Sequence, residues 1–356
     1  MARFHPLRVA QVKKETADTV SVAFDVPKEL GQEFNFKHGQ YLTLRKEIKG
    51  EDVRRSYSIC SAPGEMLRVA VKQVEGGLFS GFANEKLAEG DTLDVMTPMG
   101  NFTSALEPEI AKQYLLIAAG SGITPMMSII KTVLKAEPHS EITLMFGNRT
   151  FQSIIFRDEL EDLKDRFLGR LRIFHILSNE ANEIDLFAGR IDAEKLRRFF
   201  STFLRADKPD EVFLCGPQPM IESATETLKS LGIDSEKIHF ELFTSPKGNL
   251  WKERKPEVAA HLKGKTAQVN ITLYGQKWDL EVPFDTTVLD AAIAKGLDLP
   301  FSCKGGMCCT CRAKVNEGSV DMLANYALEP GEVDQGYVLT CQSLPKSDTL
   351  VVNFDE

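Results

Sequence analysis

The chain has 356 residues, of which 43% are hydrophobic and 26% charged, with a formal net charge of -8. This composition is typical of globular domains and argues against the fibrous, disordered and membrane-embedded classes. An acidic balance also argues against nucleic-acid binding, which usually needs a basic face. The length predicts two or three domains.

The sequence predicts neither a signal peptide nor a membrane span. Residues 1–11 contain no long apolar core, and Gly120, Gly122 and Pro125 interrupt the apolar stretch 114–130. The seven cysteines are too few and too clustered to form a disulfide framework. We therefore expect a cytoplasmic protein whose cysteines serve metal or redox chemistry.

Residues 1–108 are expected to form an antiparallel β-barrel. Short runs rich in β-branched residues alternate there with glycine, proline and charged turns, as in small barrels and sandwiches. Examples of the expected strands are residues 19–24, 41–44, 67–71 and 92–95.

Residues 109–246 change to alternating strands and helices, which predicts an α/β domain with a parallel sheet covered on both faces. The expected strands are residues 114–119, 142–146, 171–177, 211–215 and 238–243, and the expected helices are residues 123–136, 156–167, 193–204 and 219–231.

Residues 247–266 are expected to form a linker, and residues 267–356 a third, α+β domain. The stretch 245–266 carries six basic and two acidic residues together with several prolines and glycines. The last domain begins with a predicted hairpin, strands 269–273 and 277–282 around Tyr274, Gly275 and Gln276, and continues with a helix at 288–295. Its 13 acidic and 6 basic residues either steer docking to a basic partner or only keep the domain soluble.

Four cysteines of the last domain follow the spacing of a plant-type 2Fe-2S site. Cys303, Cys308 and Cys311 form a C-x4-C-x2-C run, and Cys341 is the distant fourth ligand. Two irons need four converging thiolates, and the adjacent Gly305 and Gly306 let the loop wrap a cluster with few clashes. A structural zinc site and coincidence are the weaker alternatives. Cys309 falls outside the spacing, and we expect it only to pack.

A glycine-rich turn in the α/β domain predicts a dinucleotide site. Gly120, Gly122 and Thr124 lie between a buried strand and a helix, where a pyrophosphate could approach backbone N–H groups. The third glycine of the usual fingerprint is absent. Cys215, Gly216 and Pro217 follow a later strand at the same edge, where Cys215 either lies beside a nicotinamide ring or only packs as a core residue.

Arg149 and Ser153 follow the second strand of the expected sheet, at the position that reads the ribose of the nucleotide. An arginine there can meet a 2'-phosphate, so we expect NADPH to be preferred over NADH. The alternative is that Arg149 is an ordinary solvated surface arginine.

Two segments of the barrel domain resemble the flavin-binding segments of the ferredoxin-NADP reductase superfamily. The first contains Arg55, Tyr57 and Ser58 in an R-x-Y-S pattern, and the second contains Gly76, Gly77 and Ser80 in a G-G-x-x-S pattern. The resemblance implies that Tyr57 packs on the flavin ring, Ser58 lies near its reactive N5, and Arg55 meets its phosphates. It also implies flavin-supporting positions at Gly76, Gly77, Ser80, Val71 and Lys72.

The resemblance extends to Glu241 and Phe243 in the last strand of the α/β domain, which match an E-x-F/Y segment near flavin and nicotinamide. An ordinary strand-end carboxylate is an equally good interpretation of Glu241. Ser58, Cys215 and Glu241 are therefore the expected catalytic residues.

With a β-grasp ferredoxin domain at its end, the whole chain resembles the oxygenase-reductase branch, and most of all the reductases of phenylacetyl-CoA epoxidases. This implies FAD, NADPH and a 2Fe-2S cluster as cofactors, with subunits of a multicomponent di-iron oxygenase as the electron acceptor. A related dioxygenase-reductase branch uses FMN instead. The alternatives are a reductase of another aromatic-ring or di-iron oxygenase and a redox-sensing flavin and iron-sulfur protein.

Overall fold

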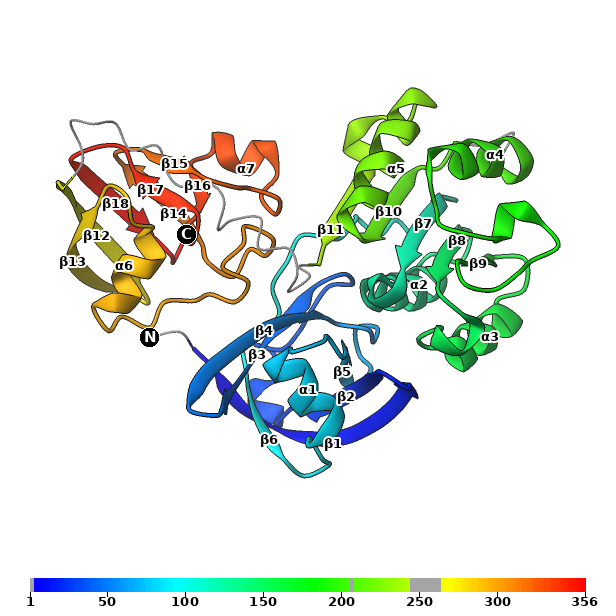
Figure 1. Ribbon diagram of the computed structural model, residues 1–356, viewed down its shortest axis with the longest axis horizontal. Helices are drawn as coiled ribbons and strands as arrows, with labels where there is room; N and C mark the ends of the chain where they lie inside the picture. Colours follow the sequence, from blue (N-terminus) through cyan, green and yellow to red (C-terminus); the bar gives the residue numbers. More distant parts are fainter. Residues whose placement is uncertain (1–2, 205–207, 244–263) are drawn as a thin grey trace. The chain divides into compact units, whose positions relative to one another are not determined.

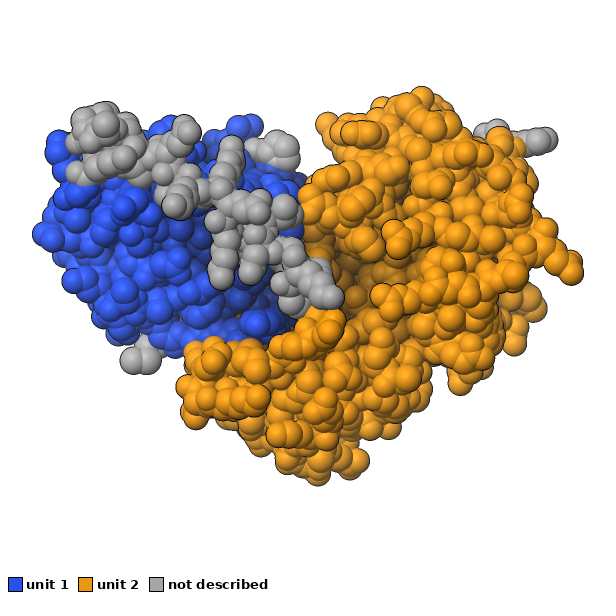
Figure 2. All heavy atoms as spheres, in the orientation of Figure 1, with its two compact units in different colours: residues 1–5, 54–56, 244–356 blue, residues 6–53, 57–243 orange. Residues whose placement is uncertain are grey.

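The computed structural model describes residues 3–204, 208–243 and 264–356. The chain divides into two compact units, residues 1–5, 54–56 and 244–356 in one and residues 6–53 and 57–243 in the other (Figure 2). None of the helices in these described ranges is both long enough and apolar enough to cross a membrane.

The N-terminal strands form a six-stranded antiparallel sheet in the order β4-β3-β6-β1-β2-β5 (Figure 1). An isolated bridge between Ile59 and Val69 joins the two ends of this sheet, which closes it as the expected barrel. The elements are β1 (His5–Thr16), β2 (Thr19–Asp25), η1 (Lys28–Leu30), β3 (Tyr41–Ile48), β4 (Glu51–Ser58), β5 (Leu67–Lys72), α1 (Leu78–Glu85) and β6 (Thr92–Val95).

Strands β1 and β4 and helix α1 were not among the elements named from the sequence. Both strands are rich in charged residues, which face solvent along much of their length, so they lack the apolar run by which the other strands were recognised. Helix α1 has only eight residues, and two further glycines precede it. Short elements of this kind are set by packing more than by local pattern.

The α/β domain is a five-stranded parallel sheet in the order β11-β10-β7-β8-β9. Its strands are β7 (Gln113–Ala119), β8 (Glu141–Asn148), β9 (Leu171–Leu177), β10 (Glu211–Gly216) and β11 (Ile238–Leu242). Its helices are η2 (Gly120–Gly122), α2 (Ile123–Ala136), η3 (Phe151–Ser153), α3 (Arg157–Arg166), η4 (Asp185–Phe187), α4 (Ala193–Phe203), α5 (Gln218–Ser230) and η5 (Ser235–Lys237).

The strand order of this sheet reverses direction between β7 and β10. The chain runs from β7 outward through β8 to β9, and then returns to place β10 on the other side of β7. Such a switch point leaves a crevice at the carboxyl ends of the two central strands, where open α/β sheets bind their ligands. Every expected element of this domain is present, with ends that differ by a few residues; β10, for example, includes Gly216.

The last domain is a five-stranded mixed sheet in the order β13-β12-β18-β14-β16, with a two-stranded ladder of β15 and β17. Its elements are β12 (Thr266–Leu273), β13 (Gln276–Pro283), α6 (Val288–Ala294), β14 (Arg312–Glu317), β15 (Val320–Met322), α7 (Pro330–Asp334), β16 (Tyr337–Leu339), β17 (Ser343–Pro345) and β18 (Thr349–Asn353). The hairpin turn is shorter than expected, because Gln276 already pairs with Leu273.

Most of the expected linker lies outside the described residues, which resume at Gly264. Thr266, expected at its end, is the first residue of β12. The domain boundaries at residues 108 and 246 stay predictions.

Candidate flavin, nicotinamide and iron-sulfur sites

Three residues expected to be catalytic lie together at one edge of the parallel sheet. Cys215 on β10 is paired in register with Glu241 on β11 and with Ala118 on β7. The Ser58 hydroxyl, at the end of barrel strand β4, donates a hydrogen bond to Oε2 of Glu241 at 2.9 Å. The flavin-binding pattern of the barrel therefore meets the strand ends of the α/β domain at this point.

Cys215 is fully buried, and this burial determines the protonation state of its thiol. Burial, with a smaller contribution from the charge of Glu241, raises the pKa of its thiol well above the ordinary value. The thiol stays protonated and is a poor nucleophile, since the thiolate is the reactive form. Cys215 can line a site with a small neutral side chain, but it is not equipped for covalent chemistry.

The glycine turn expected to bind the nucleotide lies at the start of α2 and touches the end of β10. A Cβ atom at Gly122 would lie 2.1 Å from the carbonyl oxygen of Cys215, so no larger residue fits there without movement of the backbone. The Thr124 hydroxyl donates to the carbonyl of Ser121 at 3.0 Å, within the turn. The positive end of α2 is thus presented at the switch point, where an anionic pyrophosphate is favoured.

Strand β8 lies two positions from β10 in the parallel sheet, and its carboxyl end lies at the same edge of the sheet. Arg149 is exposed there, and the Ser153 hydroxyl donates to the carbonyl of Thr150 at 2.7 Å. Asn148 is 8% exposed, and within the described parts of the chain its amide nitrogen has no hydrogen-bond partner. A buried donor without a partner at a ligand-binding edge fits a bound nucleotide, which would satisfy it.

The barrel offers a second helix end next to the expected flavin segment. Helix α1 begins directly after Gly77, and the Ser80 hydroxyl accepts from the Val74 amide at 3.1 Å, which holds the turn in place. The ring centroid of Tyr57 lies 5.6 Å from that of Phe79 on α1. The helix N-terminus and the half-buried Tyr57 ring fit a flavin with a pyrophosphate.

The remaining expected flavin residues lie on strands β4 and β5. Val71 is fully buried in β5, and the ammonium of Lys72 forms an ion pair with Asp18 at 3.5 Å. Arg55 is exposed on β4 and donates to the carbonyl of Arg54 at 2.7 Å. The individual roles of these residues stay predictions.

The four expected cluster cysteines come together as two pairs. Cys303 lies close enough to Cys308, and Cys311 to Cys341, for the thiols of each pair to shift each other's pKa. The neighbouring Cys303 side chain lowers the pKa of the Cys308 thiol to about 6. Among the described residues no three Cys, His, Asp or Glu side chains surround a single metal position. Two pairs of thiols suit a centre of two irons better than a single zinc ion.

The loop around these cysteines supplies further hydrogen-bond donors. The Gly305 amide donates to Sγ of Cys303 at 3.2 Å, and the Ser302 hydroxyl is buried with no partner in the described ranges. Gly306 has a left-handed φ of 69°, and a Cβ there would lie 2.8 Å from the Ala324 carbonyl oxygen. These features fit a cluster, because N–H and O–H donors to its sulfurs tune its potential.

Two features of these sites were missed from the sequence. Gln342 follows the fourth cysteine, and its amide donates to the carbonyl of Lys304 at 3.1 Å, which ties the two ends of the cluster segment together. Phe79, beside Tyr57, belongs to the unexpected helix α1. The glycine pair before an apolar segment was the available signal for α1, whereas nothing local distinguishes Gln342.

Family models match all three domains. Residues 6–104 match the oxidoreductase FAD-binding domain, residues 116–226 the oxidoreductase NAD-binding domain, and residues 271–346 the 2Fe-2S iron-sulfur cluster binding domain. FAD, a nicotinamide nucleotide and a 2Fe-2S cluster are therefore the cofactors of this chain.

Relatives align over the full length. The chain is 45% identical to a component of the 1,2-phenylacetyl-CoA epoxidase of Escherichia coli, covering 100% of this chain and 99% of that protein. It is 34% identical to the ferredoxin reductase component of 3-ketosteroid-9-alpha-monooxygenase of Rhodococcus rhodochrous, and the alignment covers 98% of this chain and 96% of that protein. The structure of phthalate dioxygenase reductase shares the fold, with a TM-score of 0.58 and 24% identity over 99% and 98% of the two chains. This chain thus belongs to the family of oxygenase reductases that combine FAD-binding, NAD-binding and 2Fe-2S domains.

Proposed function

We propose that this reductase passes electrons from NADPH through FAD and the 2Fe-2S cluster to a di-iron phenylacetyl-CoA epoxidase in aerobic phenylacetate degradation. The structural support for the reductase activity is the Ser58–Glu241 hydrogen bond, which joins the expected flavin segment to the expected nicotinamide-binding end of the parallel sheet. The choice of acceptor is supported by the 45% identity to a component of such an epoxidase. We also propose a cytoplasmic location, where thiolate ligands stay reduced.

The bound cofactors supply the conversion of a two-electron hydride into single electrons, which the cluster accepts one at a time. The protein residues bind and orient them. We propose that Tyr57 packs on the flavin ring and that Ser58 lies near its N5, with its hydroxyl oriented by the hydrogen bond that it donates to Glu241. Cys215 would face the nicotinamide.

The binding roles proposed for the other residues follow the same geometry. Arg55, Val71, Lys72, Gly76, Gly77 and Ser80 would hold the flavin, Gly120, Gly122, Thr124, Arg149, Ser153, Gly216 and Pro217 the nucleotide, and Cys303, Cys308, Cys311 and Cys341 the cluster.

The test of the whole proposal has two steps. Anaerobic titration with NADPH should bleach both the flavin band and the broader cluster absorbance. The purified reductase should then support epoxidation of phenylacetyl-CoA when it is mixed with the oxygenase subunits. Support of another aromatic-ring or di-iron oxygenase, with no activity toward the epoxidase, would refute the proposed acceptor and leave the reductase assignment intact.

We predict that Arg149→Ala lowers the preference for NADPH over NADH. Arg149 is exposed after β8, and a guanidinium–phosphate hydrogen bond is worth about 1.5–3 kcal/mol, so the ratio of kcat/KM values should fall by about tenfold or more. Arg166→Ala, which removes an exposed arginine near the end of α3, is the matched control. An unchanged ratio in the Arg149 variant would assign this arginine to the solvated surface.

We predict that Gly122→Ala weakens nucleotide binding by about tenfold, because overpacking of this kind costs about 1–3 kcal/mol. The added methyl group would meet the carbonyl of Cys215 and displace the turn from the end of β10. The dissociation constant for NADP⁺, measured by flavin difference spectroscopy, reports the effect. Gly331→Ala on α7, where a Cβ meets nothing within 4 Å, should bind the nucleotide normally.

A further inference from the structure

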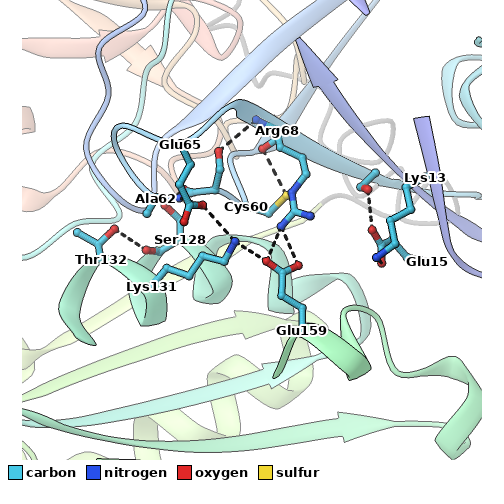
Figure 3. A network of polar contacts seen from close by, with 12 residues as sticks. Lys13, Glu15, Cys60, Ala62, Glu65, Arg68, Ser128, Lys131, Thr132 and Glu159 are labelled. Carbon is cyan, nitrogen blue, oxygen red and sulfur yellow. Dashed lines mark hydrogen bonds and ion pairs between the residues drawn. The ribbon is translucent and has the colours of Figure 1, made fainter. Parts of the chain in front are cut away.

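Charged side chains from the barrel and from the α/β domain converge on one junction (Figure 3). Arg68 on β5 donates to both carboxylate oxygens of Glu159 on α3, at 2.9 and 2.8 Å. Lys131 on α2 forms an ion pair with Glu159 and a second one, at 3.1 Å, with Glu65 in the turn before β5. We refer to Glu65, Arg68, Lys131 and Glu159 as the junction network.

The core of this network is shielded from solvent. The side chains of Arg68, Lys131 and Glu159 are 17%, 12% and 24% exposed. Burial alone would raise the pKa of the Glu159 carboxyl, but Arg68 and Lys131 hold it below its ordinary value. Glu159 therefore stays ionised at neutral pH, and its carboxylate is paired with both Arg68 and Lys131. Removal of a charge from a shielded ion pair lowers the stability of the folded protein far more than removal of a charge from an exposed ion pair.

Neutral hydrogen bonds continue the junction toward the expected flavin site. The buried hydroxyl of Ser128 on α2 donates to the carbonyl of Ser61 at 2.7 Å, and the Arg68 amide donates to the Ser61 hydroxyl at 3.1 Å. The Cys60 amide donates to the carbonyl of Arg68 at 2.8 Å. Burial raises the pKa of the Cys60 thiol to about 12, so the thiol keeps its proton and donates to the same carbonyl.

The two ends of the junction lie close in sequence to the two halves of the redox site. Cys60 is two residues beyond Ser58, which contacts Glu241. Ser128 and Lys131 belong to α2, the helix that begins at the Gly120–Gly122 turn. A displacement of α2 on the barrel would therefore change the distance and angle between the segments that hold the two rings.

We propose that the junction network sets the position of the nicotinamide turn relative to the flavin segment, with Glu159 as its central positioning residue for hydride transfer. This inference rests on the proposed assignment of Ser58 to the flavin and of the Gly120–Gly122 turn to the nucleotide. Hydride transfer needs the two rings in contact and aligned, and a misplacement of about 1 Å can cost about a hundredfold in rate.

The test is Glu159→Gln, which keeps the shape of the side chain and removes the charge that Arg68 and Lys131 share. Flavin reduction by NADPH in anaerobic stopped-flow experiments should slow by about tenfold or more. The dissociation constant for NADP⁺ should change little. The charge-transfer absorbance of the nicotinamide–flavin complex should weaken, and a primary isotope effect with deuterated NADPH should persist. Glu159→Asp should restore part of the rate.

Glu161→Gln is the matched control on the same helix. Glu161 forms an exposed pair with Lys164 at 3.3 Å, and its charge is expected to have no effect on the rate. If Glu159→Gln does not retain flavin, Arg68→Lys gives the same test, because it keeps the cation and loses the paired hydrogen bonds. A flavin-replete variant with the wild-type rate and charge-transfer band overturns the inference, even if its thermal stability is reduced. Absence of NADPH oxidation in the wild-type protein would instead overturn the proposed function.

Discussion

Replacing Cys303 by alanine is expected to remove the cluster and to abolish electron transfer to acceptors that need it. Cys303 pairs with Cys308, and loss of one of four thiolate ligands leaves one iron incompletely held. Iron and sulfide content and the cluster absorbance should fall, and cytochrome c reduction should be lost. Ferricyanide reduction, which needs only the flavin, should persist.

Cys309→Ala is the matched control for this experiment. Cys309 lies in the same loop, is 7% exposed, and donates its thiol proton to the carbonyl of Ala327 at 3.3 Å. Its loss should reduce stability slightly and leave the cluster intact. A cluster that survives in the Cys303 variant but is lost in the Cys309 variant would show that the ligand set has been wrongly assigned.

Ser58→Ala and Glu241→Gln are each expected to slow flavin reduction by NADPH by about tenfold to a hundredfold. The two side chains form one hydrogen bond: Ser58→Ala removes the hydroxyl, and Glu241→Gln removes the charge of the acceptor that orients it. The double variant should therefore be little slower than the single ones, because effects within one contact are not additive. Anaerobic stopped-flow measurement of the flavin band tests all three proteins.

Glu211→Gln provides the control for these variants. Glu211 is the first residue of β10, whereas Cys215 lies near the other end of this strand. Oε2 of Glu211 lies 2.7 Å from Nε2 of His239. We expect its flavin reduction rate to stay within about twofold of the wild type. Fully additive effects of Ser58→Ala and Glu241→Gln would mean that the two residues act independently and that their hydrogen bond does not matter for the reaction.

Most of the fold was predictable where local pattern and packing agree. Helix α2 and strands β6 and β9 have the expected ends, because glycine, proline or polar turn residues flank each of these segments in the sequence. Strand β4 was not predictable, since Glu51, Asp52, Arg54 and Arg55 mask its alternation. Its place in the barrel depends on pairing with β3, a contact between neighbours in the sheet rather than a property of the segment.

The candidate sites also combine local features, which the sequence shows, with long-range contacts, which it does not show. The cysteine spacing and the glycine turn before α2 are local features, because a cluster loop and a pyrophosphate turn are each built from a few consecutive residues. Sequence alone therefore determined the family resemblance, the three kinds of domain and the candidate ligands. Only the tertiary structure decided that Ser58 meets Glu241, 183 positions away, and that Arg68 and Lys131 share Glu159. Such contacts depend on how sheets and helices pack across the whole chain, and short-range residue pattern carries no record of that packing.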